Sequence, residues 1–448
     1  MKNNEKVRGI AKTNMEVGKL QKRWKKIELG LVAVGLCLAL LLTAAIPVCE
    51  ARPDEKVVKV GLAPGYLGPL ATIGTPCFNA QFDYFRYINE QGGINGIKIE
   101  TLWRETKGMV PDNCFALRRL APEGIVIFHE IGISEALLIV AQRVEIPVIS
   151  VDAVSAEGLA RPQWFVGAIS GWDSGIVTMT KWFKEEVWAE ARPLRLGLLV
   201  EDFLSGHKIV NFCTQNRKYF EKMGVEIVGH EFLPLTCIDS TTEWLRLVNK
   251  RADLIWFNGY GMVTVTAVKD STRLEIQQKG ITLMATPQTL DETALVVVKK
   301  DAEGWYNPTI FPLPSDPDMR ERFPGLKILA EKEKEYRGIE PEELTGWSAY
   351  GWVMSATSVE AIRVAIEKVG YENLTGRAVR DALFGGDIRN FGADCYLTRE
   401  TIDEDHPYLG SHLYVYQVRE GKTQYITELE CVQSFYISPE EFERGLGL

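Results

Sequence analysis

The sequence stretch that most constrains the fold covers residues 57–103. It opens with a β-branched run at residues 57–61, which favours a strand. After a loop rich in glycine and proline, large apolar residues recur every three to four positions, as on one face of a helix: Phe78, Phe82, Phe85 and Ile88. Gly92 and Gly93 end this segment, because glycine adopts a left-handed turn at little cost. A second strand is expected at residues 97–103, so the stretch predicts one βαβ unit.

Strand and helix patterns alternate through the rest of the chain. Short apolar runs predict strands at residues 124–129, 146–150, 164–168, 194–200, 225–232, 254–258, 281–285 and 305–311. Helices are expected at residues 114–120, 134–143, 208–223, 240–250, 265–280, 318–338, 347–370 and 374–384. Residues 413–418 and 423–427 predict a terminal hairpin that turns at Glu420 and Gly421. This alternation predicts parallel sheets covered by helices on both faces.

The N-terminal segment has the pattern of an export signal. Residues 1–28 carry nine lysines and arginines against three glutamates, and residues 29–48 have no charge. Residues 49–51 offer a cleavage site that would leave a mature start at Arg52. Alternatively, the apolar run is long enough to stay in the bilayer as an anchor. We therefore expect residues 1–51 to be a signal peptide or an N-terminal membrane anchor, with the body of the protein exported in either case.

Composition indicates a globular protein whose partner is not a nucleic acid. The 448 residues suffice for two or more domains, and 46% of them are hydrophobic and 25% charged. The net charge of −9 at pH 7 would repel a phosphate backbone.

Six cysteines follow the export segment, and an even number in an exported chain suggests disulfides. The simplest hypothesis pairs neighbours in sequence: Cys77 with Cys114, Cys213 with Cys237, and Cys395 with Cys431. The alternative is that several are buried thiols. None has CxxC spacing, so no zinc site is expected.

A catalytic function finds little support in the sequence. The nearest pattern to a nucleophile elbow centres on Ser134, but Ala136 stands where that motif needs a glycine. None of the five histidines has a recognisable triad context, and His129 is expected in the core or at a rim. The chain also lacks HExxH, P-loop and GxGxxG motifs. We therefore expect a protein that is not an enzyme and has no cofactor.

Three motifs carry a resemblance to a known family. Residues 68–74 read GPLAxxG, residues 88–100 read INxxGGINGxKIE, and residues 132–150 contain a serine followed by an IPVIS strand. Their order and spacing resemble the branched-chain amino-acid-type (leucine/isoleucine/valine-binding-protein-like) substrate-binding proteins of ABC transporters. The resemblance spans residues 57–427. It implies an α/β fold, the two-lobed type I periplasmic binding protein, in which each lobe is a parallel sheet flanked by helices and three strands form the hinge.

The resemblance also implies where the lobes begin and end, and what the protein does. Lobe one is expected at residues 57–171 plus 315–390, and lobe two at residues 172–314 plus 391–448. The implied function is an extracytoplasmic or periplasmic receptor that delivers a small amino-acid-like or carboxylate solute to an ABC permease and its ATPase. The alternative is the ligand-sensing domain of a signalling system, which we expect less because no signalling domain follows residue 448.

In lobe one the resemblance implies ligand contacts at two strand ends. Ser134 stands at a helix N-terminus, where its hydroxyl and the backbone N–H groups would hold a ligand carboxylate. The alternative is that Ser134 is only an N-cap. Asp152 and Ala153 follow the next strand at a ligand-contact position of the family, and the alternative for Asp152 is a cap for the helix after Ser155.

At the first crossing between lobes, Trp172 would stack on the ligand or pack between hinge strands, and Asp173 would lie close to the ligand. In lobe two, Phe203 stands where the family commonly has an aromatic lid. Tyr260 matches a tyrosine that contacts ligand in the family, and its alternative role is in the core.

Gln288 lies near the position where relatives that bind amino acids carry an acid. An ammonium group buried in a closed cleft needs an anionic partner. If the solute has an amine, Asp152 or Asp173 must therefore replace the missing acid. If it lacks one, Gln288 would offer neutral hydrogen bonds.

Overall fold

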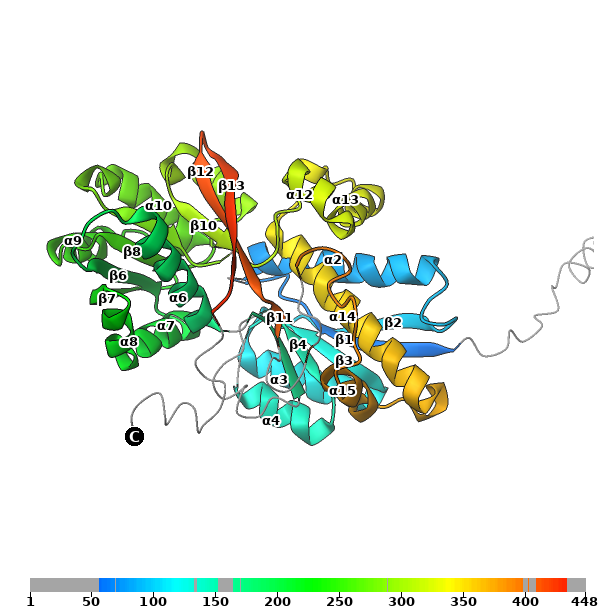
Figure 1. The fold of residues 1–448 in the computed structure, drawn as a ribbon. Coiled ribbons are helices and arrows are strands. Elements are labelled where there is room, and N and C mark those ends of the chain that lie inside the picture. The colour runs from blue at the N-terminus through cyan, green and yellow to red at the C-terminus, as the bar shows by residue number, and fades with distance from the viewer. Residues whose placement is uncertain are drawn as a thin grey trace, which may run out of the picture. The chain divides into compact units, whose positions relative to one another are not determined.

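The computed structural model describes residues 56–68, 70–132, 135–151, 164–169, 171–287, 289–397, 402 and 408–432. These residues form two sheets, each flanked by helices (Figure 1). The expected signal or anchor, residues 1–51, lies outside the described residues. Within them, no helix combines the length and the apolar character needed to cross a bilayer.

The first sheet has the strand order β2-β1-β3-β4-β5-β11, and all its pairs are parallel. Its strands are β1 (Val57–Ala63), β2 (Lys98–Trp103), β3 (Ile125–Glu130), β4 (Val148–Ser150), β5 (Phe165–Ile169) and β11 (Tyr408–Gly410). Around it lie α2 (Ala71–Glu90), α3 (Val110–Leu120), α4 (Glu135–Val144), α12 (Pro317–Arg322), α13 (Pro324–Arg337), α14 (Gly346–Val369) and α15 (Gly376–Phe384). The predicted βαβ unit of β1, α2 and β2 is confirmed.

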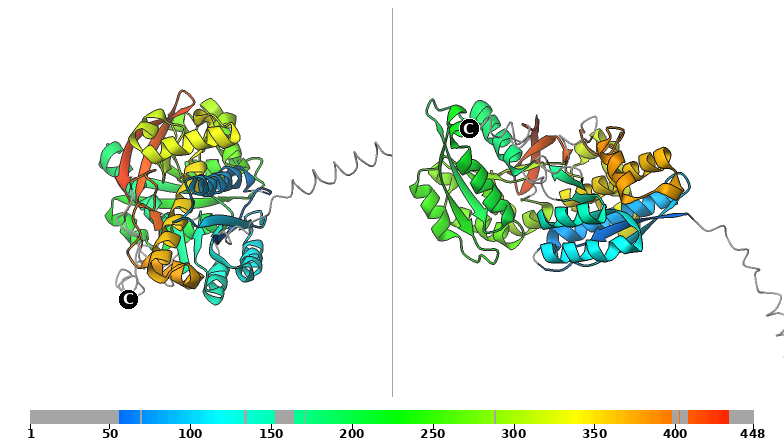
Figure 2. Two further views of the ribbon diagram at one scale, coloured as in Figure 1. Left: turned by 90° about the vertical axis from the view of Figure 1, so that its right-hand side faces the viewer. Right: turned by 90° about the horizontal axis from the view of Figure 1, so that it is seen from below.

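The second sheet has the order β7-β6-β8-β9-β10-β12-β13; its pairs are parallel from β7 to β10, and the pairs β10–β12 and β12–β13 are antiparallel. Its strands are β6 (Leu194–Glu201), β7 (Val225–Leu233), β8 (Leu254–Asn258), β9 (Thr282–Ala285), β10 (Tyr306–Thr309), β12 (His412–Arg419) and β13 (Lys422–Glu430). Its helices are α6 (Trp172–Trp182), α7 (Leu204–Gln215), α8 (Arg217–Lys222), α9 (Thr241–Asn249), α10 (Met262–Arg273) and α11 (Glu292–Val298). Figure 2 shows both groups from two further sides.

Short helical turns connect several of these elements: η1 (Ala121–Glu123), η3 (Phe183–Val187), η4 (Gln277–Lys279), η5 (Lys299–Ala302), η6 (Pro341–Glu343) and η7 (Tyr371–Asn373). One predicted helix, residues 318–338, is divided into α12 and α13. The division falls at Phe323, which has φ −117° and ψ 99°, because the following Pro324 disfavours helical backbone in the residue before it.

The central strands are buried on both faces, which explains their continuous apolar sequences. Every residue of β3 and β8 is buried, whereas no residue of β13 at the sheet edge is more than partly buried. Strands covered by helices on both sides need apolar residues at every position, and an edge strand does not.

The long helix α14 is also an interior element. It packs along α2, which is about 270 residues earlier in the chain (Figure 1). Gly351 permits this close approach, because a Cβ atom there would lie only 1.8 Å from the backbone oxygen of Cys77. His129 of β3 contacts the same two helices and is fully buried. Its Nδ1 lies 2.9 Å from Oε1 of Gln81 in α2, and its Nε2 lies 2.5 Å from Oγ of Ser358 in α14. Burial lowers the pKa of His129 to about 3, so this histidine is neutral and structural.

The expected lobe boundaries stay a prediction. The chain leaves the second sheet after β10, passes through residues 312–317 and reaches α13, which packs on α2. It returns between β11 in the first sheet and β12 in the second. The lobe boundary expected between residues 390 and 391 therefore precedes the passage of the chain from β11 to β12.

The expected disulfides are not present, so that prediction is wrong. In the first two proposed pairs the partners lie in different parts of the core, whereas Cys395 and Cys431 belong to one cluster and are both free thiols. Cys77 and Cys213 belong to the largest buried apolar cluster, but Cys114 and Cys237 belong to two other clusters. Neighbouring positions in sequence therefore do not bring these thiols together, because consecutive elements pack on opposite faces of a sheet.

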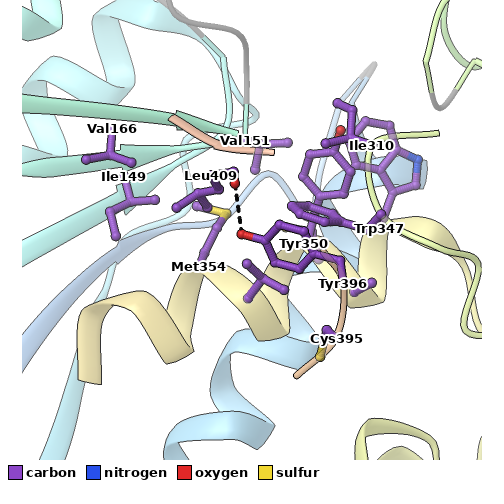
Figure 3. Close-up of a cluster of buried hydrophobic side chains, with 14 of the residues drawn as sticks. Ile149, Val151, Val166, Ile310, Trp347, Tyr350, Met354, Cys395, Tyr396 and Leu409 are labelled. Atoms are coloured by element: carbon purple, nitrogen blue, oxygen red, sulfur yellow. Dashed lines mark hydrogen bonds between the residues drawn. The ribbon is translucent and has the colours of Figure 1, made fainter. Parts of the chain in front are cut away.

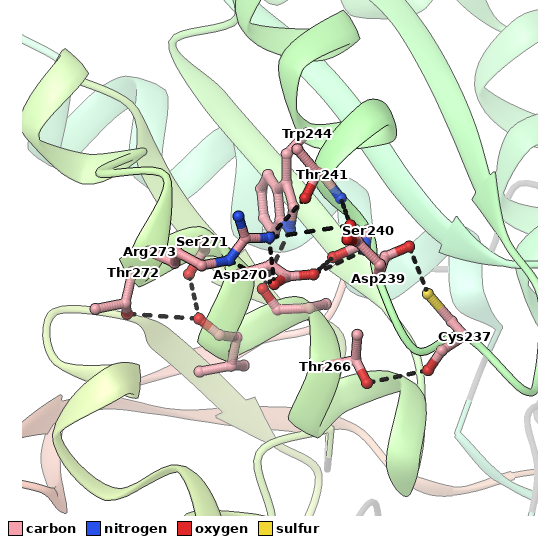
Figure 4. Close-up of polar contacts among 12 residues, drawn as sticks. Cys237, Asp239, Ser240, Thr241, Trp244, Thr266, Asp270, Ser271, Thr272 and Arg273 are labelled. Carbon is pink, nitrogen blue, oxygen red and sulfur yellow. Dashed lines mark hydrogen bonds and ion pairs between the residues drawn. The ribbon is translucent and has the colours of Figure 1, made fainter.

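Cys237 has local partners in a polar network between α9 and α10 (Figure 4). Its thiol donates to the backbone oxygen of Asp239 at 3.4 Å, and its backbone oxygen accepts from Thr266 at 3.0 Å. Beside it, the carboxylate of Asp270 accepts from the backbone N–H of Ser240 at 2.7 Å and from the guanidinium of Arg273 at 2.7 Å. These contacts hold the start of α9 against α10.

Cys77, Cys213 and Cys395 should resist alkylation in the native protein. All three are fully buried, and burial raises the pKa of the Cys77 thiol to about 12 and that of the other two above the ordinary value. Since the thiolate is the reactive form, we expect iodoacetamide to modify these residues only after unfolding in guanidinium. Mass spectrometry of differentially labelled peptides measures this, and a cross-linked Cys77–Cys114 peptide in a non-reducing digest would contradict it.

Candidate functional site

A cavity of about 240 Å³ lies where the carboxyl ends of strands from both sheets meet. Its walls include residues at, or within two positions after, the ends of strands β3, β4, β6, β8, β9 and β10: Ile131, Val151, Glu201, Tyr260, Pro287 and Ile310. In the first sheet the strand order reverses between β1 and β3, and in the second between β6 and β8. Crevices beyond the carboxyl ends at such reversals are where open parallel sheets bind ligands. The topology therefore marks this cavity as the candidate site.

Most of the wall is apolar. Leu70 and Ile73 at the start of α2 line it from the first lobe, and Leu235 and Met262 from the second. Met262 is 69% exposed, so it offers apolar surface at the edge of the cavity. An apolar cavity with exposed apolar residues near it is typical of a site that receives an apolar group.

Aromatic side chains from both lobes meet in this wall. Trp347 and Tyr350, in the first turns of α14, lie with their rings 5.0 Å apart (Figure 3). The ring of Tyr260 lies 6.3 Å from that of Trp347 in an edge arrangement, and its hydroxyl is 3.5 Å from the backbone oxygen of Pro287. Figure 3 shows Ile310 and Val151 beside the same cluster. Such rings offer large, rigid apolar surfaces to a ligand.

Two acids at the start of α11 hold Trp347 and the N-terminus of α14. Asp291 caps α11 through Ala294 and also accepts a hydrogen bond from the indole N–H of Trp347 at 2.8 Å. Glu292 accepts from the backbone N–H of Gly346 at 3.1 Å. Because α11 follows strand β9 of the second lobe and α14 packs in the first, these bonds join the two lobes beside the cavity.

Both carboxyl groups have raised pKa values. Burial raises the pKa of Glu292 from 4.5 to about 7, and the neighbouring charge of Asp291 adds to the rise. Burial also raises the pKa of Asp291, although its hydrogen bonds with Thr293, Ala294 and Trp347 oppose this.

At the second-lobe end of the cavity stands one acid, Glu201. It is the last residue of β6 and is 3% exposed. Ser205 in the first turn of α7 donates to its Oε1 at 2.7 Å. Among the seventeen residues that line the cavity in the described part of the chain, Glu201 carries the only charge.

The structure places three of the residues expected from the sequence in the cavity wall: Trp172, Phe203 and Tyr260. Trp172 begins α6, and its indole N–H is buried without an acceptor in the described part of the protein. Asp173 is 2% exposed and does not line the cavity. The other expected contacts lie outside the described residues: Ser134, Asp152, Ala153 and Gln288.

Sequence reasoning missed Glu201, Trp347 and Tyr350 as wall residues. Trp347 and Tyr350 are three residues apart in the first turns of α14, so they share one face of that helix. That spacing could have indicated a common surface. Glu201 carried a weaker signal, an acid that ends a mostly apolar strand. No group of three or more metal-ligating side chains suited to an ion occurs in the part of the chain that the structure describes.

Comparison with known protein families matches residues 57–423 to the periplasmic binding proteins. The chain belongs to the periplasmic binding protein family. The match covers both sheets except most of β13, it includes the cavity residues, and it confirms the resemblance read from the three motifs. No curated protein matches this periplasmic binding protein.

Solved structures of binding proteins share the fold. A branched chain amino acid ABC transporter protein from Thermus thermophilus with bound valine has a TM-score of 0.72 and 17% identity, over 86% of this chain and 98% of that one. A solute binding protein from R. palustris in complex with 4-hydroxybenzoate has a TM-score of 0.67 and 18% identity, over 84% and 97%. An ABC transporter substrate binding protein from Aeropyrum pernix has a TM-score of 0.72 and 15% identity, over 85% and 99%. At these identities the likeness concerns the fold, the two-lobed α/β architecture expected from the sequence.

Proposed function

We propose that this periplasmic binding protein is an extracytoplasmic receptor that binds a small amino-acid-like or carboxylate solute and delivers it to an ABC permease and its ATPase. The observation that carries the proposal is the cavity at the strand ends, with walls from both lobes. Solute would enter between the lobes and closure would bury it. The protein would act by binding, not by catalysis. Export would depend on residues 1–51.

The ligand contacts in this proposal come from both lobes. Trp172, Phe203 and Tyr260 line the cavity, which supports a direct role for them. Ser134 would hold a carboxylate at the start of α4, as expected from the sequence. Asp152, Ala153 and Gln288 remain expected contacts at the same strand ends.

A thermal-shift screen tests the proposal. The purified chain is heated with valine, other amino acids, 4-hydroxybenzoate and short-chain carboxylates. A solute that binds only the folded state raises Tm by mass action, by an amount that grows with its concentration. If none of these solutes shifts Tm while a partner protein does, the transport function is wrong.

Replacing Tyr260 with alanine should weaken solute binding by at least about 1 kcal/mol. The change removes an aromatic surface from the cavity and one edge contact with Trp347. Because Tyr260 is only partly buried, the fold should survive. Calorimetry with the solute found in the screen measures the affinity, and Tyr219→Ala, a partly buried tyrosine on α8 that does not line the cavity, is the matched control. If Tyr260→Ala and wild type bind the solute with equal affinity, Tyr260 does not contact the solute.

A further inference from the structure

Trp347 is a cavity residue that is held in place from outside the cavity. It is 4% exposed and lies in the first turn of α14, which packs on α2 in the first lobe. Its indole N–H donates to Oδ2 of Asp291 at 2.8 Å. Asp291 stands at the start of α11 in the second lobe, is 7% exposed and does not line the cavity. A wall residue of one lobe is therefore fixed by a buried carboxyl group of the other.

The two oxygens of Asp291 have separate tasks. Oδ1 caps α11, because it accepts from the backbone N–H of Ala294 at 2.8 Å and from the hydroxyl of Thr293 at 2.6 Å. Oδ2 accepts from Trp347. The cap is local, whereas the bond to Trp347 spans 56 residues of the chain and crosses between the lobes. A substitution can therefore remove the second contact and keep the first.

The bond to Asp291 decides how the Trp347 ring lies. A buried N–H group without an acceptor costs free energy, so the ring adopts the orientation in which its N–H meets the carboxyl group. Because that acceptor does not line the cavity, the apolar part of the indole is left for the wall. The ring then lies 5.0 Å from that of Tyr350, as Figure 3 shows, and 6.3 Å from that of Tyr260. All three rings line the cavity.

A second contact keeps the same two elements together. Glu292 accepts from the backbone N–H of Gly346 at 3.1 Å and from the hydroxyl of Ser315 at 3.0 Å. This contact places the backbone at the start of α14, but its bonds are not to the indole. The position of the helix thus depends on both acids, and the orientation of the Trp347 ring depends on Asp291.

We propose that Asp291 is a positioning residue for solute binding, which holds the Trp347 indole from the neighbouring lobe without touching the solute. The inference rests on the proposed solute-binding function and adds to it a residue outside the cavity. The aromatic wall is complete only in arrangements of the two lobes that keep α11 against the start of α14. The affinity for a solute that packs on this wall therefore depends on Asp291.

The indole N–H signals of protein labelled with ¹⁵N-tryptophan test the contact in the absence of solute. The signal that disappears in Trp347→Phe belongs to Trp347. In Asp291→Asn the amide oxygen can cap α11, but the amide nitrogen that then faces the indole cannot accept. We expect the Trp347 proton to exchange with heavy water about 10-fold faster or more in this variant than in wild type. Asp291→Ser, whose single oxygen is needed for the cap, should give the same result.

Calorimetry then tests whether the contact matters for binding. The probe is the tightest-binding solute among valine, L-phenylalanine, 4-hydroxybenzoate and the short-chain carboxylates of the thermal-shift screen. Asp291→Asn should weaken its binding about fivefold or more in the wild-type background. In the Trp347→Phe background the same change should weaken binding by less than about twofold, because the N–H donor is already absent. Melting curves show that each variant is folded, which we expect since asparagine caps a helix as well as aspartate does.

Asp316→Asn is the matched control. Asp316 is also a partly or fully enclosed aspartate at a helix N-terminus, where it accepts from the backbone N–H of Asp318 at 3.0 Å. It caps α12 instead of α11 and does not line the cavity. Both the exchange rate of the Trp347 proton and the affinity for the probe should stay at their wild-type values.

The possible results separate the inference from the function beneath it. An exchange rate that neither Asp291→Asn nor Asp291→Ser changes overturns the contact. An affinity that Asp291→Asn leaves unchanged, or lowers equally in the wild-type and Trp347→Phe backgrounds, shows that Asp291 does not act through Trp347. Each of these results overturns the inference and leaves solute binding intact. If none of the probes binds wild type, the proposed function is wrong, and the role of Asp291 in binding is wrong with it.

Discussion

Replacing Gly351 with alanine is expected to lower the free energy of unfolding by about 2 kcal/mol or more. The new Cβ would lie 1.8 Å from the backbone oxygen of Cys77 and 2.8 Å from its carbonyl carbon. Neither atom can move without shifting the backbone of α2. Overpacking in a core costs about 1–3 kcal/mol, and more where the backbone must move. The gain of about 1 kcal/mol in helix propensity offsets only part of this cost.

The same change should weaken solute binding. Gly351 follows Tyr350 directly and lies one turn after Trp347, so separation of α14 from α2 would displace two aromatic residues of the cavity wall. Chemical denaturation measures the loss of stability and calorimetry measures the loss of affinity.

Gly175 provides a matched control within another helix. It lies inside α6, and a Cβ there would meet only Pro287 at ordinary van der Waals distances of 3.8 and 3.9 Å. Gly175→Ala should therefore leave stability unchanged or raise it by up to about 1 kcal/mol. If Gly351→Ala behaves as Gly175→Ala does, the close contact between α2 and α14 is incorrect.

Glu292 is expected to contribute a fall of about 3 kcal/mol in the free energy of unfolding as pH rises from 4.5 to 7. The folded state keeps the Glu292 proton up to a pKa of about 7, whereas an unfolded glutamate loses it near 4.5. Between these values the folded state binds more protons, so raising the pH favours unfolding. Each pKa unit corresponds to about 1.4 kcal/mol, which gives the size of the effect. Below pH 4.5 this contribution is fully present, and above pH 7 it is lost.

Glu292→Gln should remove most of this pH dependence. The amide imitates the protonated acid: its oxygen can accept from Gly346 and its nitrogen can donate to Ser315, which lies 3.0 Å from the carboxyl group. Denaturation curves measured at pH 4.5, 6 and 8 should show that the free energy of unfolding of this variant changes less with pH than that of wild type. Some dependence should remain between pH 4.5 and 8, because burial also raises the pKa of Glu333 from 4.5 to about 8.

Glu342→Gln is the control for this experiment. Glu342 pairs with Arg320 at the surface, where its side chain is 69% exposed. Glu342→Gln should change neither the dependence of stability on pH nor the denaturation midpoint by much, since exposed ion pairs contribute little to stability. If the stability of Glu292→Gln changes between pH 4.5 and 7 as much as that of wild type, Glu292 is ionised in the folded state throughout that range.

The sequence by itself determined the order and type of most elements, because these depend on local periodicity. The apolar run of β8, the three-to-four spacing in α2 and the glycines after it are properties of neighbouring residues. The motifs at residues 68–74 and 88–100 then indicated the family and the fold. They also directed attention to strand ends, and Trp172, Phe203 and Tyr260 do line the cavity.

Only the tertiary structure decided which distant residues meet. The short strand β11 pairs with β5, more than 230 residues earlier, and has no strong signal of its own. Cys77 and Cys114 lie in separate clusters, as do Cys213 and Cys237, because consecutive elements pack on different sides of a sheet. Glu201 faces an apolar cavity, and Asp291 reaches Trp347, because two lobes far apart in sequence come together there. Burial and charge at such a site result from these long-range contacts, which local periodicity does not encode.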